Sequence, residues 1–280
     1  MEINPNISSQ ARKIGLALSG GAVLGMAHLG VFKVLEEHHI PIHCVAGTSA
    51  GAMAGAFFAA GYSYAQIWRI AKDLNWGKIG GVTFPTKGLL NSRLLERFLC
   101  QKLGNINIED LPIPFAATAV DLTTGKLIVY TAGPLARAVR ASCIIPGVFT
   151  PLEINDAVIV DGGLKSFLPV TEVQKLGADF IIAVKLVPSV NTRNKPDNII
   201  EILTNTHDLT VAHFADKSPR GDIEILPDLA GMNSYDFRQS KELVHRGAVA
   251  AQKNIKKIKK ALQLLPEKRR GLRRFLRPAL

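Results

Sequence analysis

The sequence predicts an α/β protein in three layers, α/β/α, with a mostly parallel central sheet. Short apolar segments alternate with helical patterns along most of the chain, the alternation begins with a strand–helix–strand–helix unit, and no internal repeat interrupts it. The 280 residues are 47% hydrophobic and 20% charged, which is typical of a globular chain with a substantial core. This composition excludes a disordered or fibrous protein.

The first unit occupies residues 14–60. Strands are expected over residues 14–19 and 44–46, each followed by a helix, over residues 25–37 and 50–60. Residues 38–68 carry no Asp, Glu, Lys or Arg, but glycines break this segment. A buried strand, turn and helix is therefore favoured over a membrane-spanning helix.

The alternation resumes after a less regular stretch, residues 62–110, which we expect to form a cap over a site. Further strands are expected over residues 115–120, 127–131, 158–160 and 180–187, and helices over residues 135–142, 171–176, 199–214 and 236–265. We therefore divide the chain into an N-terminal tail (1–11), one α/β domain (12–248) and a basic C-terminal helix and tail (249–280).

A serine stands at the second strand-to-helix turn, between Gly47 and Gly51 in a G-x-S-x-G sequence. Glycines allow a sharp turn in which backbone approaches backbone, and the turn exposes the hydroxyl of Ser49 at the positive end of a helix. This pattern is typical of a nucleophile. The same small residues also suit tight helix packing, so the pentapeptide alone fits both interpretations.

Two further glycine-rich turns follow apolar strands. In residues 19–25, successive backbone N–H groups can point into one concavity that suits an oxyanion or a phosphate. A dinucleotide site is disfavoured there, because Ala22 interrupts the required glycine spacing. In the second turn, Asp161 precedes Gly162 and Gly163, and an aspartate in this position is usually a turn residue.

Taken together, the ordered segments resemble the patatin-like phospholipase family of bacterial type. The resemblance covers residues 14–248. It is carried by Gly15-Leu-Ala-Leu-Ser-Gly-Gly, Ala27-His-Leu-Gly-Val, Gly47-Thr-Ser-Ala-Gly, Arg140-Ala-Ser-Cys-Ile-Ile-Pro-Gly-Val-Phe-Thr-Pro and Asp161-Gly-Gly-Leu-Lys-Ser-Phe-Leu-Pro-Val. The resemblance implies a patatin-like fold and a serine lipid acyl hydrolase of the phospholipase, lysophospholipase or esterase type, with an acyl-enzyme and no cofactor or metal.

The same resemblance implies roles for individual residues. Ser49 corresponds to the nucleophile and Asp161 to its base, as a catalytic dyad. The oxyanion hole corresponds to Gly20, Gly21 and Ala22, and the remaining motif positions are Gly25, Gly47, Gly51, Gly162 and Gly163. A carboxylate can act as the base without histidine when burial raises its pKa toward the working pH.

Two departures from the family pattern and three alternatives bear on this assignment. Ala22 stands where a third glycine is usual, and Leu24 where bacterial members generally carry arginine.

An acyltransferase would use the same acyl-enzyme, and a membrane-binding regulator would keep the fold without catalysis. A Ser–Asp–His triad is disfavoured, because none of His207, His213 and His245 stands in a loop just after an expected strand.

The net charge of +11 lies entirely in the C-terminal part of the chain. Residues 241–280 hold 13 Lys/Arg and 2 Asp/Glu, and residues 1–240 are neutral. An apolar stripe over residues 248–265 fits a helix that packs on the domain with its lysines in solvent.

Beyond this stripe, cations interleaved with Leu272, Phe275 and Leu276 predict peripheral contact with an anionic membrane. No nucleic acid partner is expected, because the tail carries no reading motif. The N-terminus lacks the apolar stretch of a secretory signal, and the three cysteines have no paired spacing. We therefore expect a cytoplasmic protein that meets a lipid ester substrate at the inner face of the cell membrane.

Overall fold

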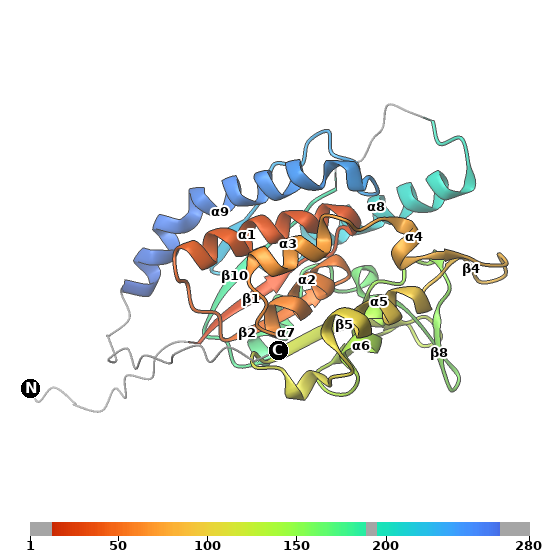
Figure 1. Ribbon diagram of the computed structural model, residues 1–280, viewed down its shortest axis with the longest axis horizontal. Coiled ribbons are helices and arrows are strands. Elements are labelled where there is room, and N and C mark those ends of the chain that lie inside the picture. Colours follow the sequence, from red (N-terminus) through yellow and green to blue (C-terminus); the bar gives the residue numbers. More distant parts are fainter. Residues whose placement is uncertain (1–12, 189–194, 264–280) are drawn as a thin grey trace, which may run out of the picture.

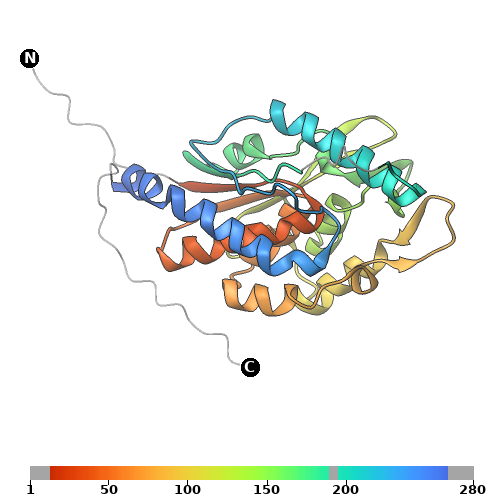
Figure 2. The same cartoon turned by 90° about the horizontal axis from the view of Figure 1, so that it is seen from above.

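The computed structural model describes residues 13–188 and 195–263, which form a central sheet with helices on both faces (Figure 1, Figure 2). The strands of the sheet are β1 (Ile14–Leu18), β2 (Cys44–Thr48), β5 (Phe115–Asp121), β6 (Lys126–Tyr130), β8 (Leu152–Ile154), β9 (Ala157–Asp161), β10 (Phe180–Val184) and β11 (Ile223–Ile225). Their order is β11-β10-β1-β2-β5-β9-β8, and β6 also pairs with β5.

Parallel pairing joins β11, β10, β1, β2 and β5, as expected when helices connect successive strands. At the other edge, β6 and β9 are antiparallel to β5, and β8 is antiparallel to β9. The predicted three-layer α/β/α class with a mostly parallel sheet is confirmed. The antiparallel edge and strand β8 were not predicted.

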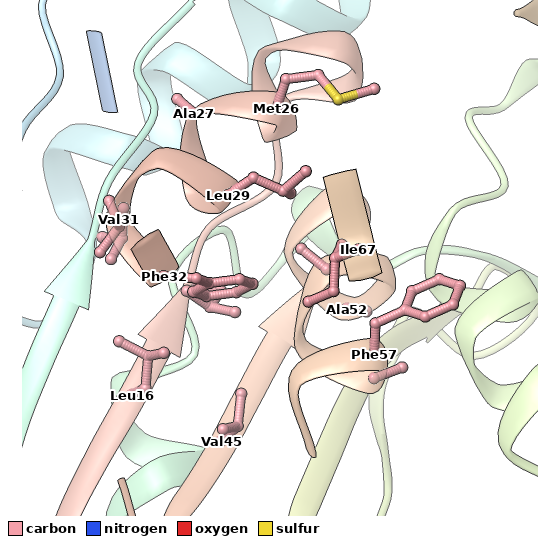
Figure 3. Close-up of a cluster of buried hydrophobic side chains, with 14 of the residues drawn as sticks. Leu16, Met26, Ala27, Leu29, Val31, Phe32, Val45, Ala52, Phe57 and Ile67 are labelled. Atoms are coloured by element: carbon pink, nitrogen blue, oxygen red, sulfur yellow. The ribbon is translucent and has the colours of Figure 1, made fainter. Parts of the chain in front are cut away.

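The alternation of side chains along the strands divides the core between the two faces. Leu16 and Val45 belong to the main cluster, whereas Ala17 and Ala46 belong to a second cluster on the opposite face. Figure 3 shows Leu16 and Val45 on neighbouring strands, directed toward Phe32. The main face is covered by α1 (Met26–Glu37), α2 (Ala50–Ala59), α3 (Tyr64–Ala71), α5 (Arg93–Leu103), α6 (Leu135–Ser142) and α9 (Ser240–Gln263), and the other face by α7 (Val170–Lys175) and α8 (Ile199–Lys217).

The stretch over residues 62–110 contains more regular structure than the sequence indicated. It forms α3, α4 (Trp76–Ile79), β3 (Gly81–Val82), β4 (Gly88–Asn91), α5 and a short 3-10 helix, η2 (Ile108–Asp110). The strands β3 and β4 form a small separate sheet with β7 (Gly147–Phe149). Among the described residues, no helix is both long enough and apolar enough to cross a membrane.

The long helix α9 runs past residue 248, where the sequence placed the end of the domain, without a break. Ala251, Ile255 and Ile258 are buried in the main cluster, and α9 packs along α1 (Figure 1). Lysines on its other side, such as Lys253, are exposed. The packed part of the chain therefore continues to the end of α9, and residues 264–280 lie outside the described residues.

The packing of α9 on α1 requires two glycines, which leads to a stability prediction. A Cβ on Gly30 would overlap the carbonyl oxygen of Val244, and one on Gly247 would overlap that of Ala27. Gly247→Ala is therefore expected to lower the free energy of unfolding by about 2 kcal/mol, measured by chemical denaturation. Lys253→Ala on the same helix should change it by less than ~0.5 kcal/mol. Equal stability of the two variants would contradict the close backbone contact.

Candidate active site

Ser49 forms the turn between β2 and α2, and its backbone is in a conformation that non-glycine residues rarely adopt, with φ 53° and ψ −122°. A Cβ on Gly47 would overlap the backbone of Gly51, and one on Gly51 would overlap the carbonyl group of Leu18. From α6, Ser142 Oγ accepts the N–H of Ser49 at 2.8 Å. Glycines thus permit the sharp turn, and the Ser142 side chain holds it.

Asp161 ends β9, is fully buried, and lies at the level of Ser49 in the sheet. Thr48 pairs with Thr118 of β5, and Asp161 pairs with Ala119, the next residue of that strand. The backbones of β2 and β9 are therefore two strand spacings, or about 10 Å, apart. The Ser49 hydroxyl lies close enough to Asp161 to lower the pKa of that carboxyl, so the two side chains are neighbours, although Oδ2 of Asp161 accepts no hydrogen bond from the described residues.

Of the two carboxylate oxygens of Asp161, one accepts a hydrogen bond and the other accepts none from the described residues. Oδ1 accepts the N–H of Gly163 at 2.7 Å, whereas Oδ2 has no hydrogen-bond partner within the described part of the chain. Burial raises the pKa of this carboxyl, and that effect exceeds the lowering by the His207 imidazole and the Ser49 hydroxyl. A buried carboxylate with a raised pKa and a free oxygen can accept a proton from a neighbouring hydroxyl.

Two threonines hold the turn that follows β9 against the strands. The hydroxyls of Thr48 and Thr118 are hydrogen bonded at 2.7 Å, and Thr48 Oγ1 donates to the carbonyl of Ser166 at 2.7 Å. Gly162 packs on Thr118 so closely that a Cβ would overlap it. Neither threonine was predicted from the sequence. Thr48 lies inside the G-x-S-x-G motif, but nothing in the local sequence distinguishes Thr118.

The turn after β1 presents two free backbone donors. Gly21 has φ 144° and Ala22 has φ 48°, and neither N–H has an acceptor among the described residues. The N–H of Gly20 donates to Phe167 O at 3.1 Å. Gly20 is therefore not available for the oxyanion role expected of it. Its backbone lies beside the serine instead, since a Cβ on Gly20 would be 3.4 Å from Ser49 Cβ.

A buried histidine supports this turn from α1. His28 Nε2 lies 2.9 Å from the carbonyl oxygen of Ser19, and burial lowers the pKa of the ring to about 4, so the neutral imidazole donates Nε2–H. Leu24, where the family resemblance led us to expect arginine, is fully buried in the main apolar cluster. Gly25 lies against the start of α2, where a Cβ would be 2.5 Å from Ala50 Cβ.

An apolar pocket includes Ser49 in its wall and extends beneath the segment expected to form a cap. Among the described residues that line it, the polar side-chain groups besides Ser49 are the Cys143 thiol and the Trp76 indole, whose N–H donates to the Tyr235 carbonyl at 2.9 Å. Burial and the charge of Asp161 raise the pKa of Cys143, so its thiol stays neutral. Apolar lining side chains include Met26, Met53, Phe57, Ile67, Leu95 and Phe149.

Of the three histidines considered for a triad, His207 lies near Asp161, but on helix α8 rather than in a loop. It is close enough for its charge to lower the pKa of Asp161. His213 and His245 are exposed. Among the described residues, no group of three or more His, Cys, Asp or Glu side chains is placed to hold a metal ion.

The geometry defines an α/β protein with a serine on a strand–helix turn, a buried carboxylate at the same level of the sheet and an adjoining apolar pocket. The sequence profile described as patatin-like phospholipase matches residues 16–173, more than half of the chain. The chain belongs to the patatin-like phospholipase family.

Individual relatives agree with this membership. An uncharacterised NTE family protein of Mycobacterium bovis is 36% identical over 181 residues, which cover 64% of this chain and 50% of that protein. Lysophospholipase NTE1 of Eremothecium gossypii is 34% identical over 197 residues, which cover 68% of this chain and 13% of that protein. The chain thus spans half or less of the length of these curated relatives.

Solved structures show the same fold at low sequence identity. The crystal structure of VipD from Legionella pneumophila matches 89% of this chain and 67% of that chain, with a TM-score of 0.58 and 14% identity. A chain in the structure of the heterodimeric ExoU–SpcU complex of Pseudomonas aeruginosa matches 89% of this chain and 52% of its own length, with a TM-score of 0.51 and 16% identity.

Burial of Asp161 predicts a stability cost at neutral pH. Folding raises the pKa of this carboxyl from its ordinary value of 3.8, so stability is lost as the pH rises from that value through the folded pKa. Asp161→Asn keeps an acceptor for the N–H of Gly163 but carries no charge. It is expected to unfold about 3 to 6 °C above the wild type at pH 7, with a smaller difference at pH 4, by thermal denaturation.

The exposed Asp156 provides the matched control for this prediction. Asp156→Asn should follow the wild-type melting temperature at both pH values, because its carboxyl is not desolvated on folding. A wild type more stable than Asp161→Asn at pH 7 would contradict the inferred cost of burying this carboxylate.

Proposed function

We propose that the chain is a serine lipid acyl hydrolase that cleaves carboxylic esters of lipids through a Ser49–Asp161 dyad and an acyl-enzyme. The observation that carries this proposal is that a serine hydroxyl in the wall of an apolar pocket lies near a buried carboxylate with a raised pKa. Membership of the patatin-like phospholipase family and the lysophospholipase name of one relative support a lipid ester as the substrate.

In the proposed acylation step, Asp161 Oδ2 accepts the proton of Ser49 Oγ while that oxygen attacks the ester carbonyl. The free N–H groups of Gly21 and Ala22 stabilise the oxyanion of the tetrahedral intermediate, and one such donor contributes about 3 kcal/mol. Protonated Asp161 then gives the proton to the departing alcohol oxygen. The acyl group is left on Ser49 Oγ, with its hydrocarbon chain in the apolar pocket.

Deacylation reverses these roles with water as the nucleophile. Asp161 accepts a proton from the water as it attacks the acyl carbonyl, and the proton passes to Ser49 Oγ when the carboxylic acid leaves. An alcohol or lysolipid in place of water would give acyl transfer by the same steps. Product analysis with an added alcohol therefore distinguishes the hydrolase from the acyltransferase alternative.

The dyad predicts that the two residues act as one unit. Ser49→Ala and Asp161→Asn are each expected to lower kcat/KM for a monomeric short-chain ester by about 10³-fold or more, and the double variant by little more than either, because both side chains serve the same step. Steady-state kinetics on folded variants measures this. Ser218→Ala, at the end of α8, is the control and should retain wild-type activity.

Losses that add in the double variant would contradict the dyad. If the folded wild type shows no turnover on any lipid ester and Ser49→Ala changes nothing, the membrane-binding regulator is the better interpretation.

We also propose that residues 266–280, which lie outside the described part of the chain, bring the enzyme to anionic membrane. The whole charge excess of the chain lies in residues 241–280, and the exposed lysines of α9 lead toward this tail. Each cation near an anionic surface contributes about 1 kcal/mol, and salt screens the attraction over ~8 Å.

The tail proposal predicts a separation of membrane binding from chemistry. A chain ending at Leu265 is expected to retain kcat/KM on a soluble short-chain ester but to lose most of its binding to anionic vesicles in cosedimentation. Full-length binding should weaken as salt rises and on vesicles without anionic lipid, which serve as the control. Equal binding of the shortened and full chains to anionic vesicles would refute a tether in this tail.

A further inference from the structure

Next to Asp161 lies a second group of buried polar side chains that the dyad does not use. His207 is 8% exposed, and within the described residues its Nε2 has no hydrogen-bond partner, as is also true of Asp161 Oδ2. Buried polar atoms without partners are rare, so two of them in neighbouring side chains require an explanation.

The packing of α8 brings these two side chains to the same buried region. The helix contacts the 3-10 turn η3 (Gly162–Leu164) that directly follows Asp161. Val211, one helical turn after His207 on the same buried face, lies 3.6 Å from the position of a Cβ on Gly163. His207 thus belongs to the layer that covers the carboxylate.

The other nitrogen of the His207 ring is already engaged. Tyr235 Oη lies 3.0 Å from Asp208 Oδ1, 3.3 Å from His207 Nδ1 and 3.3 Å from Thr204 O. Because the single phenolic proton goes most favourably to the carboxylate, the Tyr235 oxygen is left to accept Nδ1–H from His207. The ring then takes any second proton at Nε2, the atom without a partner.

We propose, building on the proposed function, that His207 is a positioning residue for the base: its imidazole, oriented by Tyr235 and Asp208, gives Nε2–H to Asp161 Oδ2 when protonated, directly or through one water. One proton at Nε2 thereby satisfies both unpartnered atoms. The neighbouring imidazole opposes the effect of burial on the pKa of Asp161, which extends to lower pH the range in which the dyad can accept the Ser49 proton.

The surroundings leave few other groups able to produce this effect. Burial and the charge of Asp208 raise the pKa of Tyr235, and burial raises that of Cys143, so both stay protonated near Asp161. The charge of His207 lowers the pKa of Asp161, whereas desolvation raises it. Within the part of the chain that the structure describes, the titratable groups found around the Asp161–His207 pair are Cys143, Asp208 and Tyr235.

The segment that carries Tyr235 also contacts the rest of the site. The carbonyl of Ser234 accepts the N–H of Val23 in the turn after β1 at 2.8 Å, and the carbonyl of Tyr235 accepts the indole N–H of Trp76 in the pocket wall. In both contacts the acceptor is a backbone carbonyl, of Ser234 or Tyr235, and not a side chain. Tyr235→Phe therefore removes the hydroxyl that orients His207 while keeping the links to the turn and the pocket.

The test is the pH profile of kcat/KM for a monomeric short-chain ester. In His207→Gln the acid limb is expected to move up by roughly 1 pH unit, which is about a tenfold loss on the acidic side, with a smaller change on the alkaline side. Tyr235→Phe should shift it in the same direction by less. His213→Gln, the same change at an exposed position of α8, should reproduce the wild-type profile.

A carboxyl ¹³C NMR titration of Asp161, assigned with Asp161→Asn, gives a second readout that needs no activity. The Asp161 pKa should be higher in His207→Gln than in the wild type. Loss of activity in Ser49→Ala tests the proposed function separately, so failure of either proposal can be told from failure of the other. Unchanged acid limbs in folded His207→Gln and Tyr235→Phe, or an unchanged Asp161 pKa, would overturn the role of His207.

Discussion

The burial of one carboxylate, Asp161, is the constraint on which the site depends. Removing an ionised group from water costs several kcal/mol unless partners replace the lost hydration, and here one backbone N–H, from Gly163, reaches Oδ1. Strand β9 runs antiparallel to β5 and ends with Asp161 opposite Ala119. The preceding residue of β5, Thr118, pairs with Thr48 at the end of β2. The mixed edge of the sheet therefore delivers the carboxylate beside Ser49.

Backbone strain at two turns accompanies this burial. Ser49 and Ala22 both have positive φ, which costs about 1 to 2 kcal/mol for a residue with a Cβ. Hydrogen bonds to distant parts of the chain hold these turns. The hydroxyl of Ser142 accepts the N–H of Ser49, and the carbonyl of Ser234 accepts the N–H of Val23. The rigid sheet and its helices thus stabilise local conformations that are unfavourable by themselves.

Local pattern predicted much of this arrangement from the sequence. Apolar runs before glycines located β1 and β2 and the turns after them, and the Asp-Gly-Gly sequence located the end of β9. What escaped prediction depends on contacts between distant residues. The N–H of Gly20 donates to the carbonyl of Phe167, a residue that only the fold brings near. A catalytic histidine was expected in a loop after a strand, so the position of His207 near Asp161, on a helix, was not predicted. Within residues 62–110, α3 and α5 are amphipathic helices that were not predicted, and apolar side chains from both, such as Ile67 and Leu95, line the pocket.

The most direct test of the account is the site of covalent modification by a serine-directed phosphonate ester, located by intact mass and peptide mass spectrometry. One adduct is expected, on Ser49; it should be absent from Ser49→Ala and form far more slowly in Asp161→Asn, since the probe requires a hydroxyl activated by the carboxylate. A folded wild type that forms no adduct, or equal labelling of Ser49→Ala at another residue, would contradict it.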